Sequence, residues 1–251
     1  MHAKPDLRVV LKWMIAGSGS VIADVIPLGQ SMPWDDLSNH LTHFTKPNGD
    51  GSAYNHMISI CYEQVLTAAS PFGIARRKAP DVQTQNSVCF SEVPLHHLDR
   101  ISERRSRYGI GFTKEFAKSK GALPVWYVEK DSQQNRILNR LIDSALDSDA
   151  PTENEIWQLS PFIDVPGEYY GKPYRFEWER EWRVIGNFSF TPDETAFLII
   201  PEELHETAAG FFRDAERDNT GPAYLCPYID SNWDKNRVEQ ALEDNWPHNE
   251  S

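Results

Sequence analysis

The chain has 251 residues, of which 40% are hydrophobic and 25% charged, and its net charge is −12. This composition is ordinary for a globular protein, and the length allows one large domain or two small ones. A negative surface field repels phosphate groups, so nucleic acid is not an expected partner.

The N-terminal segment, residues 1–35, is apolar only in part. Lys12 interrupts its hydrophobic run, and the sequence GSGS follows at residues 17–20. A signal peptide or a membrane span needs a longer unbroken apolar stretch. We therefore expect an N-terminal arm or small appended element over residues 1–35 and a single α+β domain over 36–251. We also expect a cytoplasmic protein that makes no membrane contact.

Four segments are predicted to be helices. Apolar residues recur at helical spacing in residues 55–69 and again in 133–147. A third helix is predicted to begin at Pro201, because proline is favourable in a first helical turn. A fourth is predicted over about residues 233–246.

Six runs of β-branched and aromatic residues predict strands, and most are flanked by Gly, Pro or Asp. They are residues 87–91, 108–112, 124–128, 181–185, 196–200 and 224–229. The strands do not alternate regularly with the helices, and the sequence has neither a Rossmann nor a P-loop glycine motif. We therefore predict an α+β fold with a mixed or antiparallel sheet and flanking helices.

Cysteine and histidine spacing argues against a metal centre. Cys61, Cys89 and Cys226 are far apart and include no CxxC pair. We expect buried, inert thiols rather than disulfides or zinc ligands. The histidines also lack metal-ligand spacing, so no metal is expected.

The densest basic run consists of Arg100, Arg104, Arg105 and Arg107. It predicts either a solvated helix face shared with Glu103 or a local patch for nucleic acid. The net charge of the chain favours the solvated helix face.

Residues 41–45, LTHFT, predict a strand on which His43 and Thr45 project from the same face. An imidazole and a hydroxyl can bind the amide or the ribose of a nucleotide. The alternative is a hydrogen-bonded histidine near a strand end, with Thr45 opening a loop.

Residues 88–95, VCFSEVPL, predict a hydrophobic strand that ends in Ser91 and Glu92 before a proline turn. Strand ends commonly present site residues, because a rigid element aims them. The alternative is a plain strand terminus with Glu92 capping the next turn.

Residues 177–185, EWEREWRVI, are rich in carboxylates. If the segment is extended, one face carries Glu177, Glu179, Glu181 and Arg183. Burial of these carboxylates would raise a pKa or require a cation, and Arg183 beside Glu181 could be that cation. The alternative is an edge strand with its charges in solvent.

The chain resembles the AbiGi family of abortive-infection proteins in a set of ordered motifs. In chain order they are LTHFT, VCFSEVPL, YGIGFTKE, GALPVWYV and EREWRVIG. The similarity spans roughly residues 35–200. It implies a role in bacterial phage defence, on the antitoxin side. It also implies a protein partner in a toxin–antitoxin or phage-defence pair.

A second, more distant similarity is to DarT-like ADP-ribosyltransferases. The shared order is His-x-Thr, a helix, a strand with a polar end, a Tyr-containing strand and a late Glu. This similarity implies an ADP-ribosyltransferase-like fold with NAD as the cofactor. His43 and Thr45 would contact NAD. Glu181 would be the catalytic carboxylate, and Glu179 is the alternative candidate for that role.

Three further residues would belong to the same NAD site. The polar strand end supplies Ser91 and Glu92, and the ring of Tyr108, or alternatively that of Trp126, could stack on nicotinamide.

Two functions therefore stay open. One is a mono-ADP-ribosyltransferase, in which a carboxylate stabilises the oxocarbenium-like state formed when the nicotinamide–ribose bond breaks. The other is a non-catalytic antitoxin whose acidic surface binds a basic toxin. A nucleic-acid-acting effector that uses the arginine run is a third reading, which the net charge opposes.

Overall fold

The structure is a computed structural model that describes residues 37–244, except 48, 50, 170, 171, 175 and 176. The N-terminal element expected over residues 1–35 lies outside the described residues.

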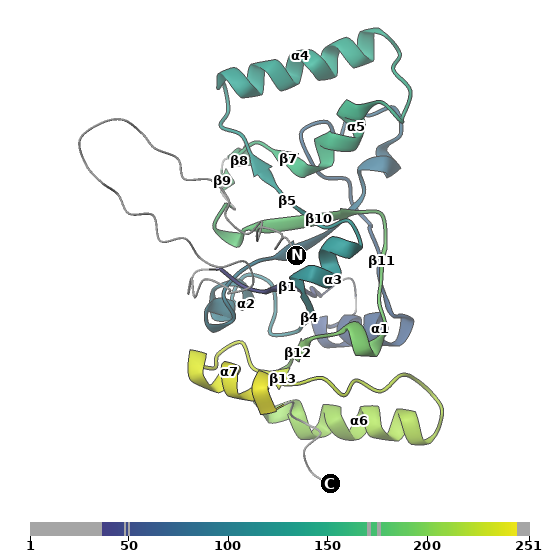
Figure 1. Cartoon of the computed structure of the whole chain (residues 1–251), viewed down its shortest axis with the longest axis vertical. Helices are drawn as coiled ribbons and strands as arrows, with labels where there is room; N and C mark the ends of the chain where they lie inside the picture. The colour runs from purple at the N-terminus through teal and green to yellow at the C-terminus, as the bar shows by residue number, and fades with distance from the viewer. Residues whose placement is uncertain (1–36, 48, 50, 170–171, 175–176, 245–251) are drawn as a thin grey trace, which may run out of the picture. The chain divides into compact units, whose positions relative to one another are not determined.

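A seven-stranded sheet with strand order β13-β12-β4-β1-β3-β10-β5 organises the described residues (Figure 1). Its strands are β13 (Tyr228–Ile229), β12 (Phe197–Ile199), β4 (Gly109–Thr113), β1 (His40–Phe44), β3 (Ser87–Ser91), β10 (Glu181–Ile185) and β5 (Leu123–Pro124). The β12–β13 pair is parallel and the other pairs are antiparallel. The predicted α+β fold with a mixed sheet is confirmed.

The sheet is nearly divided between β1 and β3. β1 pairs with β4 over five residue pairs, and β3 pairs with β10 over five, but β1 and β3 share only the pair Thr42–Ser91. We call β13, β12, β4 and β1 the first half-sheet, and β3, β10 and β5 the second half-sheet. Beyond the Thr42–Ser91 pair the two half-sheets separate.

Seven α-helices lie in the described residues, and five of them cover the first half-sheet and the adjoining strands. α1 (Ala53–Glu63), α3 (Lys114–Ser119) and α6 (His205–Arg217) pack on the face that carries Leu41, Phe90 and Phe112. α2 (Leu98–Ser102) and α7 (Lys235–Asp244) pack on the opposite face, against Phe44 and Ile199. Strand alternation places these two apolar sets on opposite faces.

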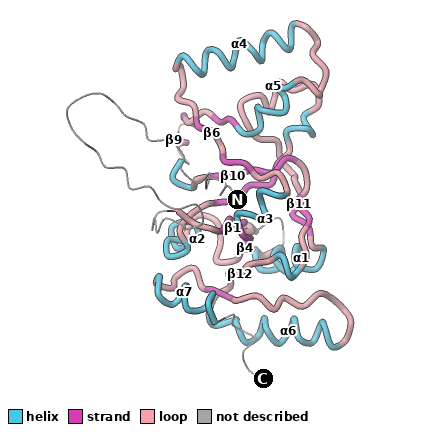
Figure 2. Tube along the Cα trace, in the orientation of Figure 1, coloured by secondary structure: helices cyan, strands magenta, loops and turns pink. Residues whose placement is uncertain are grey.

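The remaining helices, α4 (Gln133–Asp147) and α5 (Glu155–Leu159), form an apolar cluster of their own. Figure 2 shows them together beyond β10, on the other side of that strand from α6 and α7. Three small two-stranded sheets complete the description. They pair β2 (Val65–Leu66) with β11 (Phe188–Ser189), β6 (Trp126–Tyr127) with β7 (Ile163–Asp164), and β8 (Gly167–Tyr169) with β9 (Lys172–Tyr174).

Strongly patterned segments match their predictions best. The predicted helix 133–147 and the predicted strands 87–91 and 181–185 have the predicted bounds. Ser132 caps α4 by accepting a hydrogen bond from the amide of Asn135, as an N-cap serine should.

Several predicted boundaries are wrong. The helix predicted over 55–69 ends at Glu63, because Gln64 takes the left-handed conformation at φ 56° and β2 follows. The strand predicted over 124–128 is broken into β5 and β6, which pair with different partners. The strand predicted over 224–229 is reduced to β13.

The two C-terminal helices also start later than predicted. Pro201 precedes a short 3-10 helix, Glu202–Leu204, and α6 begins only at His205. The helix predicted over about 233–246 is described from Lys235 to Asp244. Helices α2, α3 and α5 were not predicted, since each has only five or six residues and too few turns to show a period.

One glycine of β4 is required by packing. A Cβ atom built on Gly111 would lie 2.2 Å from the ring of Phe197 on β12. The predicted strand 108–112 contains this glycine because the neighbouring strand places an aromatic ring directly over it.

Candidate functional site

A cleft of about 560 Å³ lies where the two half-sheets separate. Its lining includes five of the sequence-predicted site residues, His43, Thr45, Ser91, Glu179 and Glu181. A volume of this size suits a nucleotide or a similar small ligand. The cleft is therefore the candidate site, and the role of each side chain in it follows from its contacts.

His43 occupies the gap between β1 and β3. Its Nδ1 lies 2.9 Å from the carbonyl oxygen of Cys89. A carbonyl can only accept, so Nδ1 carries the proton and Nε2 of the neutral ring is an acceptor. Burial lowers the pKa of His43, and the charges of Lys46 and Arg105 lower it further against the opposing effect of the Cys89 contact. The ring is therefore neutral near pH 7.

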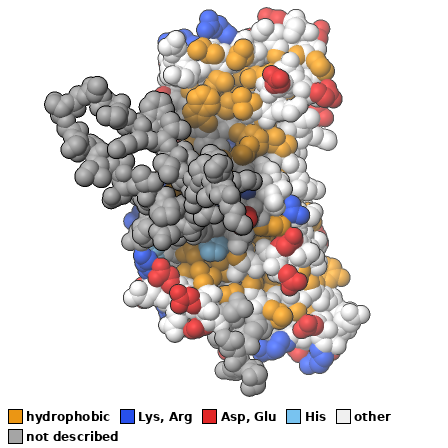
Figure 3. Space-filling model, in the orientation of Figure 1, with side chains coloured by type: hydrophobic (Ala, Val, Ile, Leu, Met, Phe, Trp, Pro, Cys, Tyr) orange, Lys and Arg blue, Asp and Glu red, His pale blue; other side chains and the backbone are white. Residues whose placement is uncertain are grey.

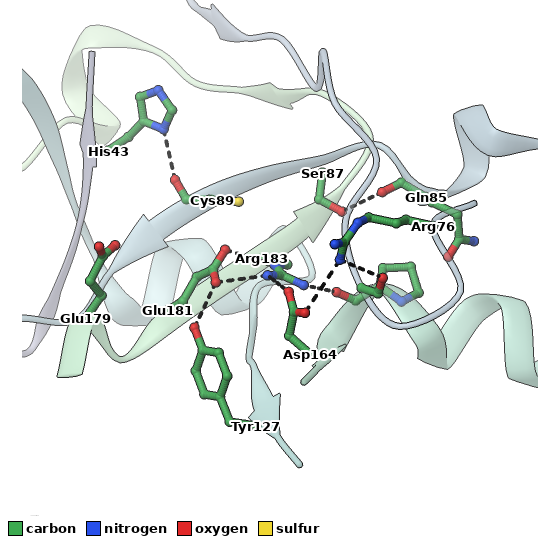
Figure 4. A network of polar contacts seen from close by, with 12 residues as sticks. His43, Arg76, Gln85, Ser87, Cys89, Tyr127, Asp164, Glu179, Glu181 and Arg183 are labelled. Atoms are coloured by element: carbon green, nitrogen blue, oxygen red, sulfur yellow. Dashed lines mark hydrogen bonds and ion pairs between the residues drawn. The ribbon is translucent and has the colours of Figure 1, made fainter. Parts of the chain in front are cut away.

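His43 and Glu181 lie on different sides of the sheet. Thr42 pairs with Ser91, and Ser91 pairs with Glu181, so these three residues share one face. His43 points to the other face, where its ring meets Phe90 edge-on at 6.0 Å between ring centroids. Figure 4 shows the imidazole on one side of β3 and the Glu181 carboxylate on the other.

Thr45 is held inside the fold. It is buried, and its hydroxyl lies 2.8 Å from the carbonyl oxygen of Ala53 and 3.2 Å from that of Tyr108. A hydroxyl has one proton to donate, and both acceptors belong to the backbone. The Thr45 side chain therefore joins the end of β1 to α1 and β4.

Glu181 is the centre of a charged network. Its carboxylate accepts from Nε and from a terminal nitrogen of Arg183, both at 2.9 Å, and from the hydroxyl of Tyr127 at 2.9 Å. The predicted role of Arg183 as the cation beside Glu181 is confirmed. Arg183 is fully buried and also donates to Asp164 of β7 at 2.9 Å and to the carbonyl of Pro161. Figure 4 shows these contacts converging on one guanidinium.

The electrostatics of this network favour the ionised carboxylate. Burial alone would raise the pKa of Glu181, but the charge and hydrogen bonds of Arg183, with the Tyr127 hydrogen bond, lower it overall. Burial raises the pKa of Tyr127, and the Glu181 charge raises it further. Glu181 is thus a fixed carboxylate with both oxygens in use, and it has no proton to exchange near neutral pH.

Glu179 does not belong to the same strand as Glu181. The prediction of one extended segment over residues 177–185 is wrong, because Glu177–Glu179 form a 3-10 helix and Arg180 turns the chain at φ 45°. Only Glu181 and Arg183 share a strand face. Glu179 is buried and pairs with Arg105 at 3.2 Å.

The basic run does not form a single solvated helix face. α2 ends at Ser102, before the last three arginines of the run. Arg105 pairs with Glu179, Arg107 pairs with Glu203 and Asp230, and the guanidinium of Arg104 lies over the ring of Trp178.

Two predicted site residues do not line the cleft. The carboxylate of Glu92 binds Lys114 and accepts a hydrogen bond from the indole of Trp182 at 2.6 Å. Tyr108 packs against the ring of Tyr54, with 5.5 Å between ring centroids. Ser91 lines the cleft at the junction of the half-sheets.

The thiols are poorly reactive. Burial raises the pKa of Cys61 to about 12. It also raises the pKa of Cys226, and it raises that of Cys89 well above its ordinary value with a further contribution from Glu181. A thiol needs to ionise to act as a nucleophile, so these environments suit packing.

The described part of the chain offers neither a cluster of metal ligands nor a membrane-spanning helix. Within residues 37–244 and outside the gaps, no group of three or more His, Cys, Asp or Glu side chains is placed to bind a metal ion. No helix in the same part is long and apolar enough to cross a membrane.

Four residues of the site were not predicted as site residues: Tyr127, Asp164, Lys46 and Arg105. Asp164 lies on a two-residue strand with no recognisable pattern. Lys46 directly follows LTHFT and lines the cleft, so its position beside a predicted site could have drawn attention to it. Arg105 belongs to the basic run, and the spacing of that run does not predict its pairing with Glu179.

Fold and site together define an α+β protein with a split mixed sheet and a polar cleft at the split. Residues 57–219 match the family model described as "Putative abortive phage resistance protein AbiGi, antitoxin". The match covers well over half of the chain, so the protein belongs to the AbiGi family, as predicted. The matched residues include four of the five motifs behind that prediction, and LTHFT lies before them. No curated protein and no solved structure matches the chain.

Proposed function

We propose that this protein is the antitoxin of a two-protein abortive phage resistance system, acting in the cytoplasm by binding its toxin. Membership of the AbiGi family supports the antitoxin role in general. One structural observation carries the binding mode, namely an exposed apolar groove between α1 and α6.

The groove has a volume of about 600 Å³ and is lined mainly by apolar and aromatic side chains. Tyr62 of α1 is 64% exposed and Phe211 of α6 is 48% exposed. Large aromatic side chains left in solvent around a groove are typical of binding surfaces, where they supply most of the binding free energy.

Charge around the groove favours a basic partner. Asp214 and Asp218 line it, and both pair with the single cation Arg217. Figure 3 shows both acidic and basic side chains over the lower part of the molecule, where α6 and α7 lie. With a net charge of −12, the chain would attract a basic toxin and dock its apolar residues between the two helices.

The test is binding of the product of the neighbouring gene, measured by co-purification and calorimetry with the full chain. Tyr62→Ser and Phe211→Ser should each weaken binding by at least about tenfold, as expected for aromatic residues at an interface centre. Leu225→Ser is the matched control, because Leu225 has the same exposed fraction as Phe211, 48%, and does not line the groove. Equal affinities for all three variants would contradict the proposal.

A second candidate is the NAD-dependent ADP-ribosyltransferase implied by the DarT-like resemblance. It is supported by the cleft, whose lining includes His43 and Glu181, and it requires a ligand that reaches both sides of the sheet at the split. For catalysis, the Glu181 carboxylate would have to leave Arg183 and Tyr127 to face the ribose, whereas Nε2 of His43 could accept from a ribose hydroxyl.

Incubation with NAD tests this second candidate. It predicts saturable NAD binding and release of nicotinamide that Glu181→Gln abolishes. Binding without nicotinamide release would leave a nucleotide-binding protein, and no binding at millimolar NAD would end this candidate.

A further inference from the structure

We propose that the mouth of the cleft is an anion-binding subsite, formed by Lys46 and Arg105, that takes a phosphate group of a nucleotide-sized ligand. This inference does not depend on toxin binding by the α1–α6 groove. It also does not require ADP-ribosyl transfer.

Among the described residues that line the cleft, ion pairing leaves one cation without a carboxylate partner. Glu181 is matched by Arg183, and Glu179 is matched by Arg105. Lys46 lines the same cleft and makes no ion pair or hydrogen bond with any residue that the structure describes. In a chain with a net charge of −12, an ammonium group without an ion pair in the described part of the cleft is a place where an anion would be stabilised.

Arg105 keeps donors available. Its contact with Glu179 uses one terminal nitrogen, which lies 3.3 Å and 3.2 Å from the two carboxylate oxygens. A guanidinium carries five N–H donors, so the other groups can still donate to a phosphate. The Arg105 side chain is 28% exposed, which leaves it accessible from the cleft.

The two cations lie close enough to repel each other. Burial lowers the pKa of Lys46, the charge of Arg105 lowers it further, and Glu179 only partly opposes these effects. A bound phosphate would relieve this repulsion and accept hydrogen bonds from both side chains.

A buried hydroxyl without a hydrogen-bond partner lies in the wall of the same cleft. Thr42 is 2% exposed, and its Oγ1 has no hydrogen-bond partner. An unpartnered buried hydroxyl is costly, and Thr42 lines this cleft on the face of Ser91 and Glu181. This oxygen is closed off from solvent, so a ligand oxygen would reach it only if β1 and β3 moved apart at the Thr42–Ser91 pair.

His43 sets the direction of the ligand. Its free ring nitrogen, Nε2, is an acceptor, and an ionised phosphate has no proton to donate to it. A phosphate is therefore favoured at Lys46 and Arg105, while a ligand hydroxyl or amide N–H would be favoured at His43. The cleft volume of about 560 Å³ leaves room for both ends.

The test is calorimetric titration of the full chain, at low salt, with inorganic pyrophosphate, ADP and NAD as separate probes. At least one probe should bind, and Lys46→Glu should weaken it by about tenfold or more. Lys130→Glu is the matched control, because it makes the same charge change at an exposed lysine outside the cleft. The control should alter affinity by no more than about twofold.

The three probes separate the sources of the phosphate. Lys46-dependent binding of pyrophosphate alone would support a simple phosphate subsite, and binding of ADP and NAD only would support one that also needs the nucleoside. Absence of binding by all three probes up to about 10 mM would overturn the proposal. Equal losses in Lys46→Glu and Lys130→Glu would also overturn it, since bulk charge would then explain the effect. NAD binding without nicotinamide release would keep the subsite and remove the transferase.

Discussion

The first half-sheet is packed with apolar side chains on both faces, whereas the second half-sheet is apolar on one face and charged on the other. Leu41 and Phe44 of β1 enter opposite apolar clusters. In β10, Trp182 enters the apolar core, but Glu181 and Arg183 face a buried ion network. The stability of the first half-sheet therefore depends on close packing of apolar side chains. The stability of the second half-sheet depends on its buried charges staying paired.

This difference places the polar cleft beside the ion network. The cleft lies at the boundary of the two half-sheets, and its carboxylates Glu179 and Glu181 are also structural ion-pair partners. A residue such as Glu181 cannot be altered for its chemistry without affecting the fixed guanidinium of Arg183.

Loss of the Arg183 charge should give the largest effect. Arg183→Met would leave Glu181 and Asp164 without their buried partner, and we expect a loss of about 3–5 kcal/mol in the free energy of unfolding. Urea unfolding followed by circular dichroism measures it. The control is Arg217→Met, because Arg217 is exposed and pairs only with exposed aspartates. If the two variants lost the same stability, the comparison of the half-sheets would fail.

Overpacking of the first half-sheet should have an intermediate effect. Gly111→Ala would drive a methyl group into the ring of Phe197, and we expect about 1–3 kcal/mol of destabilisation. Gly210→Ala is the control, since Gly210 lies within α6 and a Cβ there meets nothing within 4 Å. Alanine in a helix should leave stability unchanged or raise it. A tolerated Gly111→Ala would show that β4 and β12 can move apart.

Acidification should have the smallest effect. Burial is the main cause that lowers the pKa of His43 from 6.5, so the folded state binds its proton less readily than the unfolded state. Stability from neutral His43 is present above pH 6.5 and is lost as the pH falls from there towards the lowered pKa. Between pH 7.5 and 5.5, wild type should lose about 1 kcal/mol more than His43→Gln in urea unfolding. Equal losses in both proteins would assign the pH dependence to other groups.

The sequence predicted those parts whose pattern is local. α4 shows clear helical spacing, and the alternation of β10 predicted that Arg183 would meet Glu181 two residues away. The left-handed turn at Arg180 had no such pattern, so Glu179 was placed on the wrong element. The contact of Arg183 with Asp164 depends on two strands brought together by the fold, and spacing in the sequence could not reveal it.

The cleft itself also escaped sequence analysis. LTHFT and VCFSEVPL were both recognised as candidate segments, and both strands do border the cleft. That they share only the pair Thr42–Ser91 is a property of the whole sheet. The role of Lys46 also depends on the whole fold. Lys46 has no ion pair among the described residues because Glu179 pairs with Arg105 and Glu181 pairs with Arg183.

The most direct test is growth of bacteria that make the toxin together with one of three variants of this protein, each verified to fold by circular dichroism. The variants are Tyr62→Ser with Phe211→Ser, Glu181→Gln, and the control Leu225→Ser. Binding through the α1–α6 groove predicts that the double variant loses protection while Glu181→Gln and Leu225→Ser still protect. Protection by the double variant together with loss of protection in Glu181→Gln would contradict the proposed function and place the activity in the cleft.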